Sequence, residues 1–258
     1  MRKKLSIMML TARASMKRLV AVLAGMAILE WILFFVALNR EALTGALRFE
    51  VWNESVNVSM VFSVLIGQSK ISIIFLVGLI LYFVALCGNI FGKKGCHVEY
   101  SFDRLALSKK TMFGCVAVYN ILCFFLFWGI QVLLLLVFAG MYATQPGQIE
   151  CGPQTILLSF YEQPFLHLML PTGSEYLYII HIVLWILFGI ATVPLSLQYA
   201  DNVQGSLIGI ALGLVCIGAF FGASTLWIMA MIVAAVAVSY TLRVVFYDGG
   251  ENYEKVSS

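Results

Sequence analysis

The stretch that decides the fold is Ile71–Phe91, ISIIFLVGLILYFVALCGNIF, which contains no charged residue. About 20 apolar residues in a helix are enough to cross the roughly 30 Å hydrocarbon core of a bilayer. The whole chain agrees with such a segment, because 62% of its residues are hydrophobic and only 11% are charged. Soluble domains carry about 25% charged residues. The sequence therefore indicates an all-α integral membrane protein, and it excludes a soluble enzyme, a disordered chain and a nucleic-acid-binding module.

Further apolar stretches lie on both sides of this one. The apolar stretch Leu19–Leu38 comes before it and is interrupted only by Glu30. Further apolar stretches follow in the charge-free windows Thr111–Ile149 and Asn202–Leu242. The last window is long enough for two spans, with a turn near Gly218–Ser224. The prediction is a single transmembrane domain, 1–258, in which six helices cross the membrane at about 19–38, 71–91, 112–143, 176–197, 206–221 and 225–245.

Six spans place both termini on the same side of the membrane, and the basic residues indicate which side. Cytoplasmic loops carry the excess of Lys and Arg. With both termini in the cytoplasm, only Arg40, Arg48 and Lys70 of the 16 basic residues lie outside. We therefore expect a multi-pass protein of a bacterial plasma membrane, with outer segments at 39–70 and 144–175.

The first 18 residues are basic and amphipathic. Apolar residues recur at three- and four-residue steps, and polar or basic residues fall largely opposite them. This pattern predicts a helix over 1–18 that lies in the inner interface with its basic face toward lipid head groups. A disordered basic tail and the n-region of a signal peptide are the alternatives. The apolar positions are Leu5, Met8, Met9, Ala12, Met16 and Leu19, and the opposite positions are Arg2, Ser6, Arg13 and Lys17.

Three polar residues inside the predicted spans are candidates for a functional role: Glu30, Gln131 and His181. An ionisable side chain in a membrane is costly unless it faces a cavity or a partner. One interpretation is a buried Glu–His or Glu–Gln hydrogen bond that holds helices together. Lining of a substrate path is a second interpretation, and coupling to protons is a third.

The predicted cytoplasmic loop 92–111 is longer than a simple reversal of direction requires. It carries Phe102 and Leu105 as a small apolar face, with Asp103 and Arg104 beside them. A short amphipathic helix of this kind is suited to dock an apolar ridge into a groove of a partner protein. A positively charged anchor that only sets the topology is the alternative.

Three glycines of the fifth predicted span, Gly205, Gly209 and Gly213, recur at four-residue steps. Small residues at this spacing form a groove in which another helix backbone approaches closely. That helix belongs either to the same chain or to a second copy, and a homodimer contact is the favoured interpretation.

The outer segment 144–175 is unusually apolar for a loop. Its part Thr155–Leu170 is too short and too interrupted to span a membrane. An interfacial or re-entrant helix is expected instead. Guarding of an exit path is one interpretation of this element, and simple packing on top of the helix bundle is an equal alternative.

The chain lacks the motifs that would make it an enzyme. No G-x-x-x-x-G-K-[ST], H-E-x-x-H or G-x-S-x-G pattern is present in the sequence. The three histidines, His97, His167 and His181, fall on three different levels of the predicted topology, so a metal site is not expected. We predict no catalytic residue, no metal and no cofactor in this chain.

The order of these parts resembles the permease subunits of type-two ATP-binding-cassette (ABC) exporters. The resemblance rests on the basic N-terminal helix, six spans and the amphipathic loop after the second span. It also rests on Arg104-Leu-Ala-Leu-Ser-Lys-Lys-Thr-Met-Phe113, which looks like the segment that leads from the coupling helix of that family into the third span. The layout covers nearly the whole chain.

The resemblance implies two permease copies in the bilayer and two separate ATPase subunits, which bind ATP and Mg. At the matching positions, Phe102, Asp103, Arg104 and Leu105 would contact the ATPase. Spans one and five would form the seam between the permease copies, in line with the glycine series.

The chain also departs from the family pattern. Its prominent outer segment lies between spans three and four, whereas the connection between spans five and six is short. The substrate therefore stays open among peptides, lipids, drugs and glycans. A structural or sensory membrane subunit that transports nothing is the main alternative, and a secondary transporter, which would usually show internal repeats, is the third.

Overall fold

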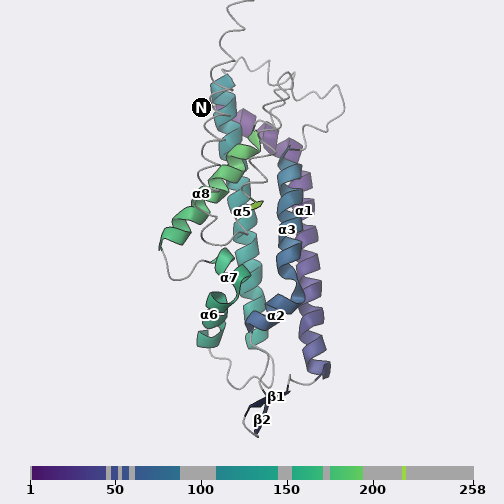
Figure 1. Ribbon diagram of the computed structural model, residues 1–258. Coiled ribbons are helices and arrows are strands. Elements are labelled where there is room, and N and C mark those ends of the chain that lie inside the picture. Colours follow the sequence, from purple (N-terminus) through teal and green to yellow (C-terminus); the bar gives the residue numbers. More distant parts are fainter. Residues whose placement is uncertain are drawn as a thin grey trace, which may run out of the picture. The chain divides into compact units, whose positions relative to one another are not determined.

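The computed structural model describes residues 2–44, 48–51, 54–57, 62–87, 109–144, 153–170, 175–193 and 217–218 (Figure 1). These residues are predominantly helical, and one short strand pair accompanies the helices. The elements, in chain order, are α1 (Arg2–Thr44), β1 (Arg48–Val51), β2 (Glu54–Asn57), α2 (Phe62–Ser69), α3 (Ile71–Cys87), α5 (Lys109–Ala143), α6 (Pro153–Glu162), α7 (Pro164–Met169) and α8 (Glu175–Ala191).

The chain divides into two compact units, and we describe each separately. Unit 1 comprises Met1–Val20, Leu81–Leu126 and Ile179–Ser258, and unit 2 comprises Ala21–Ile80 and Phe127–Tyr178.

Within the described residues, two helices are long and apolar enough to cross a membrane: Ser15–Asn39 within α1 and Phe113–Ala143 within α5. They agree with the predicted spans 19–38 and 112–143. A third is added if the bent pair α2 and α3 counts as one span. α8 overlaps the predicted span 176–197, but its apolar part, Tyr178–Ala191, is shorter than a full crossing.

The remaining parts of the predicted topology lie outside the described residues. This applies to the spans at 206–221 and 225–245, apart from residues 217–218, and to the loop 92–111 up to residue 108. Six spans and cytoplasmic termini therefore stay predictions.

The long helices expose apolar side chains on one face and bury aromatic side chains on the other. Large exposed hydrophobic side chains on a helix need an apolar surrounding to cover them. On α5 the exposed side chains are Val118, Leu122, Leu126, Leu133, Leu136 and Val137, whereas the buried ones include Phe124, Phe127, Leu135 and Phe138. This distribution is consistent with a helical membrane protein.

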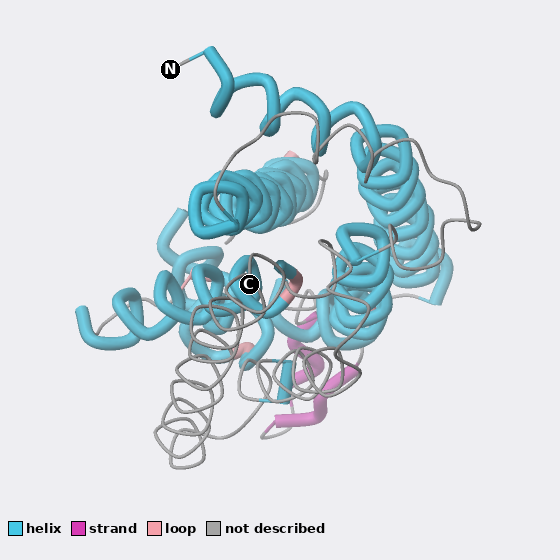
Figure 2. The backbone as a smooth tube through the Cα atoms, turned by 90° about the horizontal axis from the view of Figure 1, so that it is seen from above, coloured by secondary structure: helices cyan, strands magenta, loops and turns pink. Residues whose placement is uncertain are grey.

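The predicted outer segment 39–70 contains regular secondary structure. It contains the antiparallel pair β1–β2, in which Arg48 lies opposite Asn57 and Val51 opposite Glu54 (Figure 2). The described elements are therefore helical except at this hairpin. Four-residue strands are too short for their alternating pattern to be recognised in a sequence.

The same segment contains α2, which is separated from α3 by the single residue Lys70. The two helices are bent by 53° relative to each other, and Figure 1 shows α2 turned away from the line of α3. The bend lies at Lys70, whose φ of 57° is in the left-handed region, which non-glycine residues seldom adopt. The amide of Ile73 donates to the carbonyl oxygen of Lys70 at 3.0 Å, so α3 begins directly after the bend.

The outer segment 144–175 contains two short helices, α6 and α7, where the sequence suggested one element over Thr155–Leu170. The break has a local cause. The Gln163 side chain caps α7 by accepting a hydrogen bond from the amide of Leu166 at 2.7 Å. Pro164 follows at the first helical position, where a missing amide hydrogen does no harm. Capping and proline together begin a new helix at this point.

Within unit 2 these short helices pack against α2 and α5. The Ser63 hydroxyl donates to Glu162 Oε2 at 3.1 Å, and the rings of Phe62 and Phe160 lie 6.3 Å apart. The indole of Trp128 on α5 donates to the carbonyl oxygen of Met169 at 3.0 Å, at the end of α7. These contacts show packing within the unit, and a re-entrant or interfacial position in the bilayer stays a prediction.

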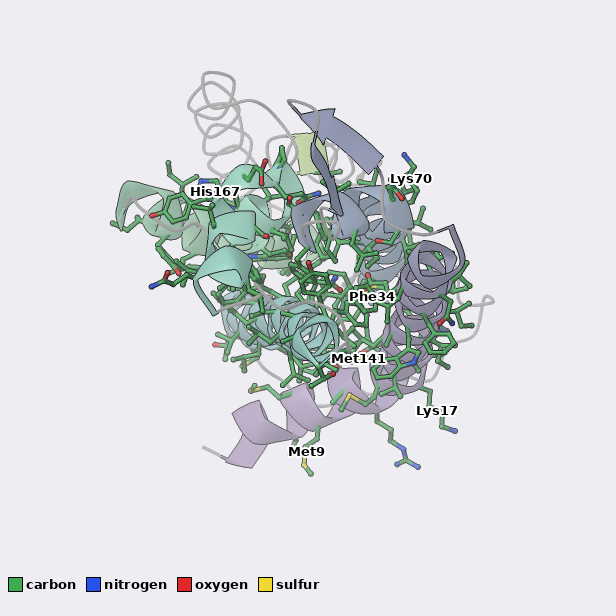
Figure 3. The ribbon with its side chains drawn as sticks, turned by 90° about the horizontal axis from the view of Figure 1, so that it is seen from below. Met9, Lys17, Phe34, Lys70, Met141 and His167 are labelled. Atoms are coloured by element: carbon green, nitrogen blue, oxygen red, sulfur yellow. The ribbon has the colours of Figure 1, made fainter. Side chains whose placement is uncertain are left out.

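Residues 2–18 are helical, as predicted, but they are continuous with the span in α1. Thr11, Ser15 and Leu19 are buried, whereas Met9 is 68% exposed, and Figure 3 shows the side chains of Met9 and Lys17 directed outward. The interfacial position of this segment stays a prediction.

The close approach of α8 to α5 in unit 1 predicts a steric effect at Gly189. A Cβ atom there would come within 2.7 Å of the Cα atom of Ile121, which cannot move without shifting the helix. We expect Gly189→Ala to destabilise the protein by about 1–3 kcal/mol. The melting temperature of the purified protein in detergent measures this effect.

Gly129 is the matched control, because a Cβ atom there meets nothing within 4 Å. Gly129→Ala should leave the melting temperature unchanged or raise it, since alanine favours the helix by up to about 1 kcal/mol. Equal melting temperatures for the two variants would contradict the close helix crossing.

Candidate functional site

Glu30 and Gln131 meet inside unit 2. The Gln131 Nε2 atom donates a hydrogen bond to Glu30 Oε2 at 3.0 Å. Both side chains are 0% exposed, and both lie within the candidate spans, Glu30 on α1 and Gln131 on α5. The structure therefore contains the Glu–Gln hydrogen bond that was one interpretation of these residues.

The helical repeat places both residues on buried faces. In unit 2 the buried positions of α1 are Leu23, Met26, Glu30, Phe34 and Leu38, and those of α5 include Phe127, Gln131, Leu135, Phe138 and Tyr142. These positions recur at three- and four-residue steps, which keeps them on one side of a helix. Each polar residue thus occupies a position that an apolar side chain would otherwise fill.

Aromatic rings pack on the C-terminal side of Glu30 in α1. Phe34 stacks on Phe138 with a centroid distance of 4.5 Å and an interplanar angle of 13°, and Trp31 lies 6.0 Å from the same ring. Figure 3 shows Phe34 directed into the interior of the helices. These rings hold α1 against α5 and fix the register in which Glu30 meets Gln131.

α3 packs against α1 and α5 one turn before Glu30 and Gln131. Gly78 gives room to Met26, one turn before Glu30, because a Cβ atom at position 78 would overlap the Met26 thioether. One turn before Gln131, the ring of Phe127 lies 5.4 Å from Phe75, which in turn lies 5.5 Å from Phe165. The polar pair is therefore enclosed by aromatic and apolar side chains.

The pair has more acceptors than donors. Glu30 Oε1 and Gln131 Oε1 are both buried and have no hydrogen-bond partner among the described residues. A buried acceptor without a donor costs about 1–3 kcal/mol, and more if it is charged. The arrangement can therefore accept a donor from outside the pair, which is the chemistry of a binding site rather than of a saturated structural contact.

His181, the third candidate, belongs to unit 1. It lies on α8 and is 2% exposed.

Unit 1 contains polar contacts that the sequence did not indicate. The Asn120 amide donates to the Thr192 hydroxyl at 2.9 Å, and Ser15 and Tyr119 share a hydrogen bond of 2.8 Å between their hydroxyls. The Tyr82 hydroxyl donates to the carbonyl oxygen of Cys123 at 2.9 Å. Asn120 is a polar residue among apolar ones in a charge-free window, and this position was the feature of the sequence that could have indicated the contact.

The other candidate residues lie outside the described part of the chain. These are the expected partner contacts Phe102, Asp103, Arg104 and Leu105, and the glycines Gly205, Gly209 and Gly213. Within the described part, no group of three or more His, Cys, Asp or Glu side chains could hold a metal ion.

A hollow beside the α2–α3 bend is separate from the Glu30–Gln131 pair. It is lined by Leu33, Val36, Ala37, Gln68, Ser69 and Lys70. Lys70 is exposed and directed outward (Figure 3), so this hollow opens at the surface.

The spans, their exposed apolar faces and the buried polar pair define a helical membrane protein. Comparisons with protein-family models, with curated proteins and with solved structures find no match for this chain. The functional argument therefore rests on the residues themselves.

The pairing predicts how substitutions at the two positions combine. Gln131→Leu removes the donor and leaves the Glu30 carboxyl buried alone, which we expect to cost about 1–3 kcal/mol. Glu30→Gln keeps a hydrogen-bonding side chain of the same size and should cost less. Thermal unfolding in detergent compares the variants.

The double variant with leucine at both positions tests whether the two residues interact. It should be more stable than Gln131→Leu alone, because no unpaired polar group remains. Strictly additive effects would show that the hydrogen bond contributes nothing to the fold.

Proposed function

We propose that the chain is the membrane-spanning permease subunit of an ABC exporter. It forms the substrate pathway, and a separate ATPase subunit, which binds ATP and Mg, drives the transport. The observation that carries the proposal is the stretch Arg104–Phe113, which resembles the entry into the third span of that family. In support, α5 begins at Lys109, so this stretch runs directly into a long span.

The proposed topology has six spans with both termini in the cytoplasm of a bacterial cell. It is supported by the distribution of basic residues, of which only Arg40, Arg48 and Lys70 fall on the outer side. The two candidate spans and the bent pair α2–α3 agree with the first three crossings of this scheme.

Transport is favoured over a purely structural role by two features of unit 2. Glu30 and Gln131 place unmatched acceptors in an apolar surrounding, where polar side chains usually serve a function. Apolar segments are also broken at Lys70 and at Gln163. Irregular backbone within a membrane is tolerated where it is buried in protein or lines a cavity.

Under this proposal the chain has no catalytic residue of its own. Its partners are the ATPase subunit at the cytoplasmic face, a second permease copy and the surrounding lipid. Phe102, Asp103, Arg104 and Leu105 form the contact with the ATPase subunit. The chemical class of the substrate is not assigned.

The proposal predicts that an ATPase subunit co-purifies with the tagged chain from membranes in mild detergent. Reversal of both charges, Asp103→Lys with Arg104→Glu, should abolish this association and the coupling of ATP hydrolysis to transport, while membrane insertion is unchanged. Arg48→Glu on the predicted outer side is the matched charge-reversal control and should co-purify normally.

Two results would contradict this proposal. One is the absence of any ATPase subunit from the wild-type preparation, which would favour a structural or sensory subunit. The other is labelling of residues 92–110 from outside the cell, because a coupling loop must face the cytoplasm.

The proposed second copy is tested at the middle glycine of the fifth predicted span. Gly209→Leu fills a groove that small residues keep open, and we expect the dimer to dissociate into monomers. Cross-linking and the mass of the detergent-solubilised protein measure this change. An unchanged oligomer with unchanged ATPase coupling would show that the groove faces lipid.

A further inference from the structure

We propose that the Glu30–Gln131 pair is a proton-binding site, in which one proton is shared between Glu30 Oε1 and Gln131 Oε1. The proposal concerns unit 2 alone and does not depend on the proposed ATP-driven function. It rests on the buried position of the pair, on its hydrogen-bond geometry and on the two acceptor atoms that have no donor.

The count of donors and acceptors favours a proton as the ligand. Gln131 Nε2 already donates to Glu30 Oε2 at 3.0 Å. The remaining oxygens, Glu30 Oε1 and Gln131 Oε1, lack a partner among the described residues. A carboxylic acid has one O–H donor, whereas a carboxylate has none. A single proton on Glu30 Oε1 therefore provides the donor that Gln131 Oε1 lacks.

The product of this binding step is an acid–amide pair with two antiparallel hydrogen bonds. The Glu30 O–H group donates to the Gln131 carbonyl oxygen, and the Gln131 amide donates to the Glu30 carbonyl oxygen. Only an O–H bond forms, and the proton comes from the solution. No electron transfer is involved, and the pair is electrically neutral.

The described side chains of unit 2 offer no charged group beside the pair that could take the place of the proton. Between residues 21 and 39, α1 carries no other ionisable residue, and the part of α3 from 71 to 80 carries none. The part of α5 in unit 2 adds only Tyr142, whose ring packs on Phe62. On α7, which packs on α5, the ionisable group is His167, whose ring lies 6.0 Å from that of Tyr161.

Among the residues of unit 2 whose side chains the structure describes, the remaining charged groups are Glu162 and Lys70. Glu162 accepts its hydrogen bond from Ser63 on α2, and Lys70 is directed outward (Figure 3). An isolated carboxylate in an apolar surrounding costs several kcal/mol. The neutral pair is thus the state in which α1 and α5 pack as observed, and loss of the proton weakens this contact.

Infrared spectroscopy of the full-length protein in lipid nanodiscs tests the proposal. At neutral pH, the difference between the wild type and Glu30→Gln should contain one C=O band of a protonated carboxyl group, which the variant has lost. Because the acid donates to an amide, this band should lie at a lower frequency than the acid band of Gln131→Leu, in which the partner is missing.

Glu162→Gln is the matched control, because Glu162 is an exposed carboxyl group in the same unit. Its difference spectrum should show only the loss of a carboxylate band. If Glu30→Gln did not fold, the assignment would come from the comparison of the wild type with Gln131→Leu, in which the acid band of Glu30 shifts.

Two outcomes would overturn the proposal. A carboxylate band in the difference between the wild type and Glu30→Gln would show that the site holds no proton. An acid band at the same frequency in the wild type and in Gln131→Leu would show that the proton is not shared with Gln131.

Discussion

Helices in a bilayer are not driven together by the hydrophobic effect, because lipid tails are as apolar as leucine side chains. Their association depends on close packing and on hydrogen bonds between helices, and this constraint governs both units of the protein. In unit 2 the contact of α1 with α5 combines the stacked rings of Phe34 and Phe138 with the hydrogen bond between Gln131 and Glu30. In unit 1 the contact of α5 with the end of α8 combines the close approach at Gly189 with the Asn120–Thr192 hydrogen bond. Each contact thus pairs one polar bond with one well-packed position.

The same constraint explains where the helices break. A backbone amide or carbonyl that leaves a helix needs another partner, and in an apolar surrounding only the protein provides it. At Gln163 the side chain provides that partner for α7, and at the other end of α7 the indole of Trp128 bonds the carbonyl oxygen of Met169. At Lys70 the carbonyl oxygen accepts from Ile73. The breaks are therefore specific structures with satisfied backbone groups.

The sequence was sufficient for the spans within α1 and α5, because length and composition alone define a membrane crossing. It also singled out Glu30 and Gln131, since a polar residue is conspicuous in an apolar stretch. Their pairing was only one of several alternatives, because the two residues are 101 positions apart and nothing local sets their register. The hairpin β1–β2 and the positive φ of Lys70 carry no strong local signal and were missed. The hydrogen bond between Ser15 and Tyr119 was also missed, because hydroxyl groups are common in membrane helices and carry no strong signal.

α5 is the element that connects these observations. Within unit 1 its residues Tyr119, Asn120 and Cys123 bond to Ser15, Thr192 and Tyr82, and within unit 2 its residues Trp128 and Gln131 bond to Met169 and Glu30. The helix is continuous from Lys109 to Ala143, and under the proposed function the loop 92–111 runs into its first turn. Within unit 2, a pair held by a shared proton has two distinct states, one bonded and neutral and the other separated and charged.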